Sequence, residues 1–168
     1  HSHVEYTSFR GILDDLDFGD WIIRLIDVKA ALTPDEYLVS ARLGAVEAIS
    51  SGITTLADTS YGGAALTALS EAGLRGRVYL EIFGIDDTRV EQTIAEAEKR
   101  LDQAQAAASP LIDVGLTPHS PYTVSSRLYQ AVSALARARN LKVMTHVAES
   151  KDELTYVRSG SGKLAHDY

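Results

Sequence analysis

The chain has 168 residues, of which 45% are hydrophobic and 23% charged, a composition typical of one globular core. The net charge of −7 and the scatter of the basic residues argue against a nucleic-acid partner. No apolar run approaches the roughly 18 residues that span a bilayer, and the first residues lack the pattern of a secretory signal. We therefore expect a cytoplasmic protein that does not bind membranes. Cysteine is absent, so any metal must be held by histidine or carboxylate side chains.

The chain opens on the triplet His1-Ser2-His3. Alternate side chains of an extended segment share one face, so this triplet aims two imidazoles at one point. Two closely spaced imidazoles of this kind suit a metal ion. Terminal histidines are also typical of purification-tag remnants, and the triplet by itself does not separate the two interpretations.

Two helices are predicted next. Apolar residues recur at helical spacing between positions 18 and 26, which places Trp21 in the core or in the wall of a pocket. Thr33-Pro34-Asp35-Glu36 has the features of a helix N-terminus: a threonine cap, proline at the first position and acids in the first turn. We expect this second helix to end at Gly52.

From residue 53 onward, short apolar segments alternate with longer helical ones. The expected elements are strands at 53–58, 77–83, 112–116 and 142–146, and helices at 63–71, 86–108 and 125–138. Such alternation predicts βαβ units and a parallel sheet. No glycine-rich phosphate loop follows any of these strands. The sequence thus favours part of a (β/α) barrel over a nucleotide-binding doubly wound sheet.

Polar residues gather at the predicted strand ends. If the opening triplet closes a first strand, five strand ends share one edge of the sheet. Four of the five histidines lie there: His1, His3, His119 and His146. This clustering predicts a metal site, with Asp58 at another strand end. His166 belongs to a polar tail and is expected at the surface.

Glu149 follows His146 by three residues. A neutral imidazole at the carboxyl end of a strand is a good metal ligand, and a carboxylate one turn later is placed to move a proton beside it. The alternative is a histidine that is only packed or hydrogen-bonded, followed by a solvated glutamate that opens a helix.

These motifs resemble the amidohydrolase superfamily, in its branch of metal-dependent aminohydrolases. That branch includes adenosine-type, S-adenosylhomocysteine, guanine and aminofutalosine deaminases, with triazine hydrolases close by. The matching segments, in the order of the family, are His1-Ser2-His3, Gly52-Ile53-Thr54-Thr55 with Asp58, Thr117-Pro118-His119-Ser120-Pro121-Tyr122 and His146-Val147-Ala148-Glu149-Ser150. The match spans nearly the whole chain and favours the ligand interpretation of the opening triplet.

The resemblance implies an α/β fold: a partial TIM (β/α)8 barrel made of strands 1–5 with their helices. Residues 1–168 would then be a fragment of a single metal-dependent hydrolase barrel domain. By the same resemblance, His1, His3 and His146 would bind one divalent metal, which we expect to be zinc, with iron as the alternative.

The resemblance also assigns roles in catalysis. Glu149 would be the proton shuttle, and His119 would reach the substrate as a second catalytic residue. Trp21 and Tyr122 are expected to contact the substrate with His119. The metal would activate a water molecule for attack on an amino-bearing ring carbon, and ammonia would leave.

Two departures from the family matter. The family needs a histidine after strand six and an aspartate after strand eight, and this chain stops before either, so we expect the isolated fragment to be inactive. In addition, Lys29-Ala30-Ala31 stands where adenosine and S-adenosylhomocysteine deaminases place a ribose-binding acid. That difference favours a modified nucleoside or another amino-heterocycle as substrate.

We therefore expect a metal-dependent hydrolytic deaminase of an amino-substituted heterocycle of the purine, pterin or modified-nucleoside type. The expected partner is a small-molecule substrate, and a homo-oligomer is compatible with the sequence. One alternative is a hydrolase that removes chloride or an amide at the same site. Another is a non-catalytic βα scaffold fragment whose histidines are vestigial.

Overall fold

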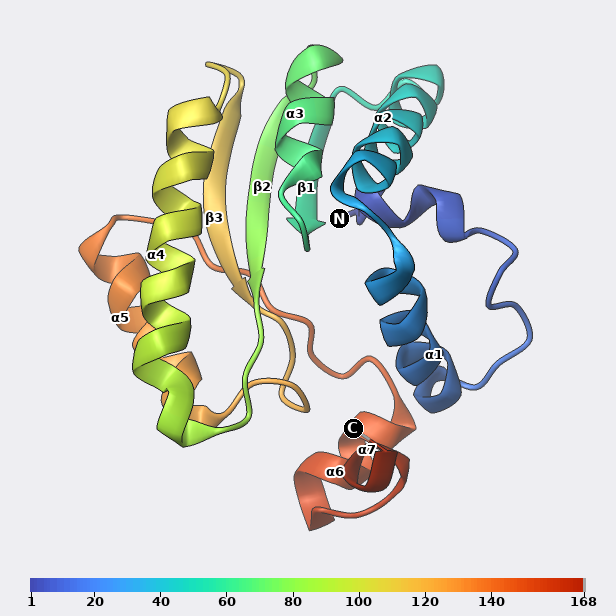
Figure 1. Ribbon diagram of the computed structural model, residues 1–168, viewed down its shortest axis with the longest axis vertical. Helices are drawn as coiled ribbons and strands as arrows, with labels where there is room; N and C mark the ends of the chain where they lie inside the picture. The colour runs from blue at the N-terminus through green and yellow to red at the C-terminus, as the bar shows by residue number, and fades with distance from the viewer. Residues whose placement is uncertain (168) are drawn as a thin grey trace.

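The computed structural model describes residues 1–167, apart from the side chain of Asp167, and contains a parallel sheet with helices around it (Figure 1). The sheet consists of β1 (Thr55–Ser60), β2 (Arg75–Ile82) and β3 (Ile112–Pro118), hydrogen-bonded in that order. All pairings are parallel, with Asp58 beside Val78 and Val78 beside Val114. The predicted α/β class with a parallel sheet is confirmed.

Helices form most of the remaining described chain. They are η1 (Val4–Phe9), α1 (Phe18–Ala31), α2 (Pro34–Ser50), α3 (Ala64–Glu71), η2 (Asp87–Arg89), α4 (Val90–Ala107), α5 (Ser126–Ala138), α6 (Lys151–Ser159) and α7 (Lys163–Asp167), where η marks a 3-10 helix. The predicted start of α2 is confirmed, because Thr33 and Glu36 cap each other reciprocally. Among the described residues, no helix is both long and apolar enough to cross a lipid bilayer.

The first and fifth predicted strands are not strands in the structure. Residues 1–3 and 142–146 run parallel to β1 and β3, yet each pairs at a single bridge, Ser2 with Asp58 and Val143 with Leu116. The physical reason is that η1 begins at Val4 and ends the first ladder, while the other segment has a partner on one side only. The five segments nevertheless lie side by side in chain order, as successive strands of a parallel barrel do.

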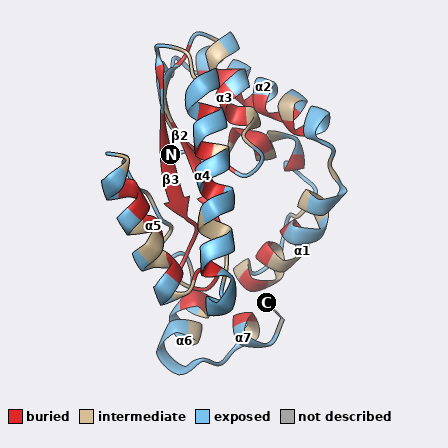
Figure 2. Ribbon diagram, turned by 60° about the vertical axis from the view of Figure 1, so that its left-hand side comes forward, coloured by how far each residue is buried: buried red, intermediate tan, exposed pale blue. Residues whose placement is uncertain are grey.

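The apolar core lies between the sheet and helices α2 to α5 (Figure 2). Its fully buried residues include Leu69, Val78, Leu101, Leu116 and Val132. Helix α2 packs through small side chains instead: a Cβ added at Gly44 would lie 2.9 Å from the Cβ of Val4 in η1. Four of the larger apolar residues of α2 are exposed, namely Val39, Leu43, Val46 and Ile49.

A buried carboxylate ties η1 to the sheet. Glu5 is completely buried and accepts hydrogen bonds from the hydroxyl of Ser60 and from the backbone N–H groups of Tyr61, Gly62 and Ala65. These N–H groups lie at the start of α3, where unpaired donors favour a negative charge. Glu5 thus fixes the segment that directly follows the opening triplet.

We expect Glu5→Gln to destabilise the protein by about 3 kcal/mol, because an amide NH2 would then face backbone donors that now bind a carboxylate oxygen. Urea unfolding of the full-length protein measures the change. The matched control is Glu47→Gln, which removes an exposed ion pair with Arg10 and should change stability by less than about 1 kcal/mol. Equal shifts for the two variants would show that Glu5 is not an anchor.

Candidate active site

The opening triplet is held against β1 by Asp58. The Oδ2 atom of this buried side chain accepts hydrogen bonds from the Ser2 hydroxyl (2.6 Å) and the Val4 N–H (2.9 Å). Burial raises the pKa of Asp58 to about 7, although these two hydrogen bonds oppose the rise. The side chain comes from within β1 rather than from its last residue, and it sets the position from which His1 and His3 project.

His146 is oriented by the residue that follows β3. Its backbone N–H donates to the carbonyl oxygen of His119 (2.9 Å), and its ring Nδ1 lies 3.2 Å from the same oxygen. A carbonyl oxygen only accepts hydrogen bonds, so Nδ1 carries the proton. The Nε2 atom of a neutral His146 therefore presents a lone pair.

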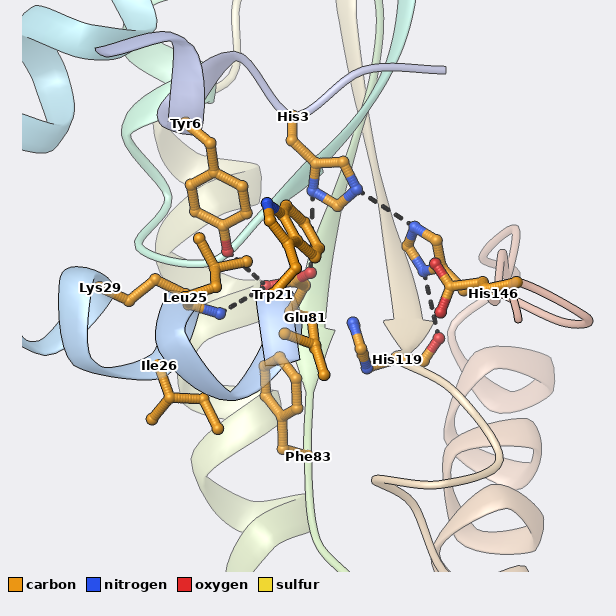
Figure 3. A pocket seen from close by; sticks show the side chains of 12 residues that line it. His3, Tyr6, Trp21, Leu25, Ile26, Lys29, Glu81, Phe83, His119 and His146 are labelled. Carbon is orange, nitrogen blue, oxygen red and sulfur yellow. Dashed lines mark hydrogen bonds and ion pairs between the residues drawn. The ribbon is translucent and has the colours of Figure 1, made fainter. Parts of the chain in front are cut away.

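Three imidazoles converge at this point. Nε2 of His146 lies 3.1 Å from Nε2 of His3 and 3.3 Å from Nε2 of His1, and Figure 3 shows the His3 and His146 rings pointing toward each other. Ligand atoms of all three residues lie within 4.8 Å of one another. Nitrogens bound tetrahedrally to zinc at about 2.0–2.1 Å lie about 3.4 Å apart. The separations and the donor chemistry both fit one divalent cation.

Two histidines of the site are neutral at physiological pH. Burial lowers the pKa of His3 to about 3 and that of His119 to about 3, and the nearby His146 adds to both decreases. The ring of His119 follows β3, hydrogen-bonds Thr123 through Nδ1 (2.8 Å), and has its centroid 5.2 Å from that of His146. His119 thus lies beside the three converging rings and outside their group.

A cleft leads to these histidines from the side of α1. It encloses about 520 Å³, part of it open to solvent, and His3, His119, His146 and Glu149 line its polar side. The apolar wall of the cleft consists of Trp21, Ile22, Leu25, Ile26 and Phe83, and the Phe83 ring packs against that of His119. The structure places Trp21 in the pocket wall, one of its two expected positions. Such a wall suits a flat heterocycle.

Glu149 is held from two directions. One of its carboxylate oxygens, Oε2, accepts a hydrogen bond from the Tyr122 hydroxyl (2.9 Å). Its backbone N–H and that of Ala148 donate to the buried carboxylate of Glu153 (2.6 and 2.9 Å). Tyr122 is only 1% exposed and does not line the cleft. Tyr122 thereby orients Glu149, and its expected contact with substrate stays a prediction.

Two charged residues of the cleft, Glu81 and Lys29, were given no role in the site by the sequence reasoning. Glu81 is a buried acid near the end of β2, and burial raises its pKa to about 7, while the neighbouring Lys29 ammonium opposes that rise. Lys29 lies in the last turn of α1, and burial lowers its pKa. An acid inside an otherwise apolar strand was the available signal for Glu81. For Lys29 the available signal was its helical spacing from the apolar residues Ile22 and Leu25, which places all three on the same face of α1.

The sequence model described as the amidohydrolase family matches residues 1–167. The chain belongs to the amidohydrolase family. His166, which lies in the last part of the match, is exposed as expected.

Curated relatives of this amidohydrolase chain are deaminases by name. It is 33% identical over 171 residues to the 5'-deoxyadenosine deaminase of Methanothermobacter thermautotrophicus. The aligned region covers 100% of this chain and 40% of the relative. It is 32% identical to the 5-methylthioadenosine/S-adenosylhomocysteine deaminase of Thermococcus kodakarensis, over 97% of this chain and 39% of the relative. The chain therefore spans about 40% of the length of the curated relatives that it matches.

Solved structures share the amidohydrolase fold. Helicobacter pylori aminofutalosine deaminase in complex with methylthio-coformycin superposes with a TM-score of 0.80 at 21% identity, over 96% of this chain and 39% of that chain. A zinc-bound adenosine deaminase of Xanthomonas campestris superposes with a TM-score of 0.74 at 25% identity, over 99% and 39% of the respective chains.

We expect the full-length protein to bind about one zinc ion per chain, with His146→Ala lowering the zinc affinity by more than about 100-fold. Loss of a ligand should exceed the 10–100-fold typical for an outer-shell partner. Competition with a chromophoric chelator measures the affinity. His166→Ala is the control, because this exposed histidine lies outside the converging group. Equal affinities for both variants would contradict the site.

Proposed function

We propose that the full-length protein is a zinc-dependent hydrolytic deaminase that removes the amino group of an adenosine-type nucleoside. The observation that supports this most directly is the convergence of His1, His3 and His146 beside the carboxylate of Glu149. The deaminase names of the curated relatives support the leaving group and the substrate class. Residues 1–168 would form part of one barrel domain, and the likeness to solved amidohydrolases supports this.

The three histidines would hold the metal. His146 offers Nε2 because its Nδ1 faces a carbonyl oxygen, and the nearest imidazole nitrogens lie at separations suited to zinc. Three imidazoles leave a further coordination position open, as catalytic zinc sites do. Zinc rather than iron is supported by the Xanthomonas campestris deaminase, whose structure contains zinc. When bound, such a cation supplies a water molecule of lowered pKa.

Glu149 would move the protons of the reaction. The Tyr122 hydroxyl occupies its Oε2 atom and fixes the carboxylate, so Oε1 is the oxygen for proton transfer. It would pass one proton of the attacking water to the ring nitrogen next to the amino-bearing carbon. It would then pass the remaining hydroxyl proton to the amino group, so that the carbonyl forms as the carbon–nitrogen bond breaks and ammonia leaves. His119 would hydrogen-bond the substrate from the end of β3, and the apolar wall around Trp21 would pack against the base.

The substrate assay is an ammonia-release screen of the zinc-loaded full-length protein. Its panel contains 5'-deoxyadenosine, 5'-methylthioadenosine, S-adenosylhomocysteine and adenosine, together with aminopterins and aminotriazines. The proposal requires turnover of at least one adenosine derivative at a higher kcat/KM than of any pterin or triazine. Ammonia release from pterins or triazines alone would keep ammonia as the leaving group and replace the adenosine-type nucleoside by another amino-heterocycle. No turnover at all, in a protein that also fails to retain zinc when it is loaded with the metal, would favour the scaffold.

Glu149→Gln should lower kcat by about 10²–10⁴-fold and leave the zinc content unchanged, because it removes the proton carrier and no metal ligand. Ammonia release and elemental analysis measure the two effects on the same preparation. Glu91→Gln serves as the control, since Glu91 pairs with Arg127 on the surface and should retain full activity. Unchanged kcat in Glu149→Gln would remove Glu149 from the mechanism.

Residues 1–168 expressed alone should release no ammonia from any of these compounds. The family supplies a further histidine and a catalytic aspartate from later strands, and an incomplete sheet leaves an unpaired edge and an uncovered inner face. The same assay, run beside the full-length protein at equal concentration, measures this. Turnover above the buffer blank by the isolated residues would show that the present histidines and Glu149 suffice.

A further inference from the structure

Glu81 is a buried acid that the proposed reaction leaves without a role. It lies on β2, one residue before the end of the strand, and its side chain is 1% exposed. A carboxylate in such a position is strongly disfavoured unless charged or hydrogen-bonding groups surround it. Its surroundings therefore indicate what it does.

The two oxygens of Glu81 face different groups. Oε2 lies 3.4 Å from the Tyr6 hydroxyl, which donates to it, and 4.0 Å from Nζ of Lys29. Oε1 lies 4.0 Å from Nδ1 of His3, as the dashed lines around Glu81 in Figure 3 show. One oxygen is thus turned toward the substrate side of the cleft and the other toward the metal centre.

Lys29 is itself fixed in place. Its side chain is 13% exposed, and its Nζ lies 3.9 Å from the ring centroid of Tyr61 and 5.1 Å from that of Phe83. Faces of aromatic rings attract an ammonium group, and Glu81 provides the opposite charge. Lys29 is therefore engaged with groups of the protein, and it holds the Glu81 carboxylate where Oε1 faces His3.

The Nδ1 atom of His3 is buried and lacks a hydrogen-bond partner of good geometry within the described structure. Its nearest charged acceptor is Oε1 of Glu81. The backbone of Thr59 is a second, uncharged acceptor, whose hydrogen bond with the ring raises the pKa of His3 and whose geometry is too poor to satisfy Nδ1. A cation bound at Nε2 would make Nδ1–H a stronger donor, which draws a carboxylate from ion-pair distance toward hydrogen-bond distance.

We propose that Glu81 is a positioning residue of the metal centre: its carboxylate takes the Nδ1–H of His3, holds that ring in the tautomer whose Nε2 lone pair faces His146, and is itself held by Lys29 and Tyr6. This inference rests on the metal site of the proposed function. It gives the buried acid, the buried lysine and the unpartnered nitrogen one common role. It also connects α1, which forms the substrate wall, to a metal ligand.

A double-mutant cycle tests the proposal on the full-length metal-free protein. Zinc affinity is measured by chelator competition at fixed pH and salt for wild type, Glu81→Ala, His3→Ala and the double variant. Glu81→Ala should weaken zinc binding by about 10–100-fold. The same substitution should change affinity by less than about two-fold once His3 is absent, because the two residues act through one contact. Glu81→Gln should lose less affinity than Glu81→Ala, since its amide oxygen still accepts a hydrogen bond.

Three controls keep the result interpretable. Glu71→Ala removes an exposed acid paired with Arg42 and should leave zinc affinity unchanged. Thermal unfolding of each metal-free variant separates lost affinity from lost folding. Where Glu81→Ala does not fold, a long-range ¹H–¹⁵N spectrum of the wild-type protein decides, because it reports the tautomer of His3 without any substitution.

Three outcomes would overturn the proposal. One is a Glu81→Ala variant with wild-type zinc affinity, which would leave Thr59 to orient the ring. Another is an equal loss of affinity with and without His3. The third is an Nε2–H tautomer of His3 in the metal-free protein. None of these measurements uses a substrate, so a protein that deaminates nothing would refute the proposed function and leave this inference standing.

Discussion

The site depends on one electrostatic constraint. The Nε2 atoms of His3 and His146 lie 3.1 Å apart, and His146 offers a lone pair there because its Nδ1 faces a carbonyl oxygen. Two nitrogen lone pairs at this distance repel each other. Burial lowers the pKa of His3, so a proton placed between the two nitrogens is disfavoured as a way to remove that repulsion. A cation bound between the rings, as the proposed function requires, would relieve it.

Buried carboxylates hold the segments that meet at this point. Glu5 joins η1 to the start of α3, Asp58 holds the opening triplet against β1, and Glu153 fixes the loop that carries Glu149. Each accepts at least one hydrogen bond from a backbone N–H group, which has few other partners in an irregular segment. These acids thus add directional hydrogen bonds to the apolar packing of the segments around the cleft.

The βα alternation could be read from the sequence because its period and its caps are local properties. The strands around Val78 and Leu116 and the cap at Thr33 follow from residues within a few positions of one another. The segments at Ser2 and Val143 were expected as strands, but a strand depends on a partner ladder that local composition does not encode. The hydrogen bond from Tyr122 to Glu149 likewise could not be predicted, because a motif indicates that residues lie near each other and not which way their side chains point.

The sequence alone determined which residue types stand at the strand ends, and hence that His1, His3, His119 and His146 share one edge. Only the tertiary structure decided that three of these rings converge while His119 stays apart, and that Glu81 and Lys29 belong to the same cleft. The reason is physical. Periodicity and motif order specify a face of the sheet, whereas distances below about 4 Å depend on side-chain packing between segments remote in the chain.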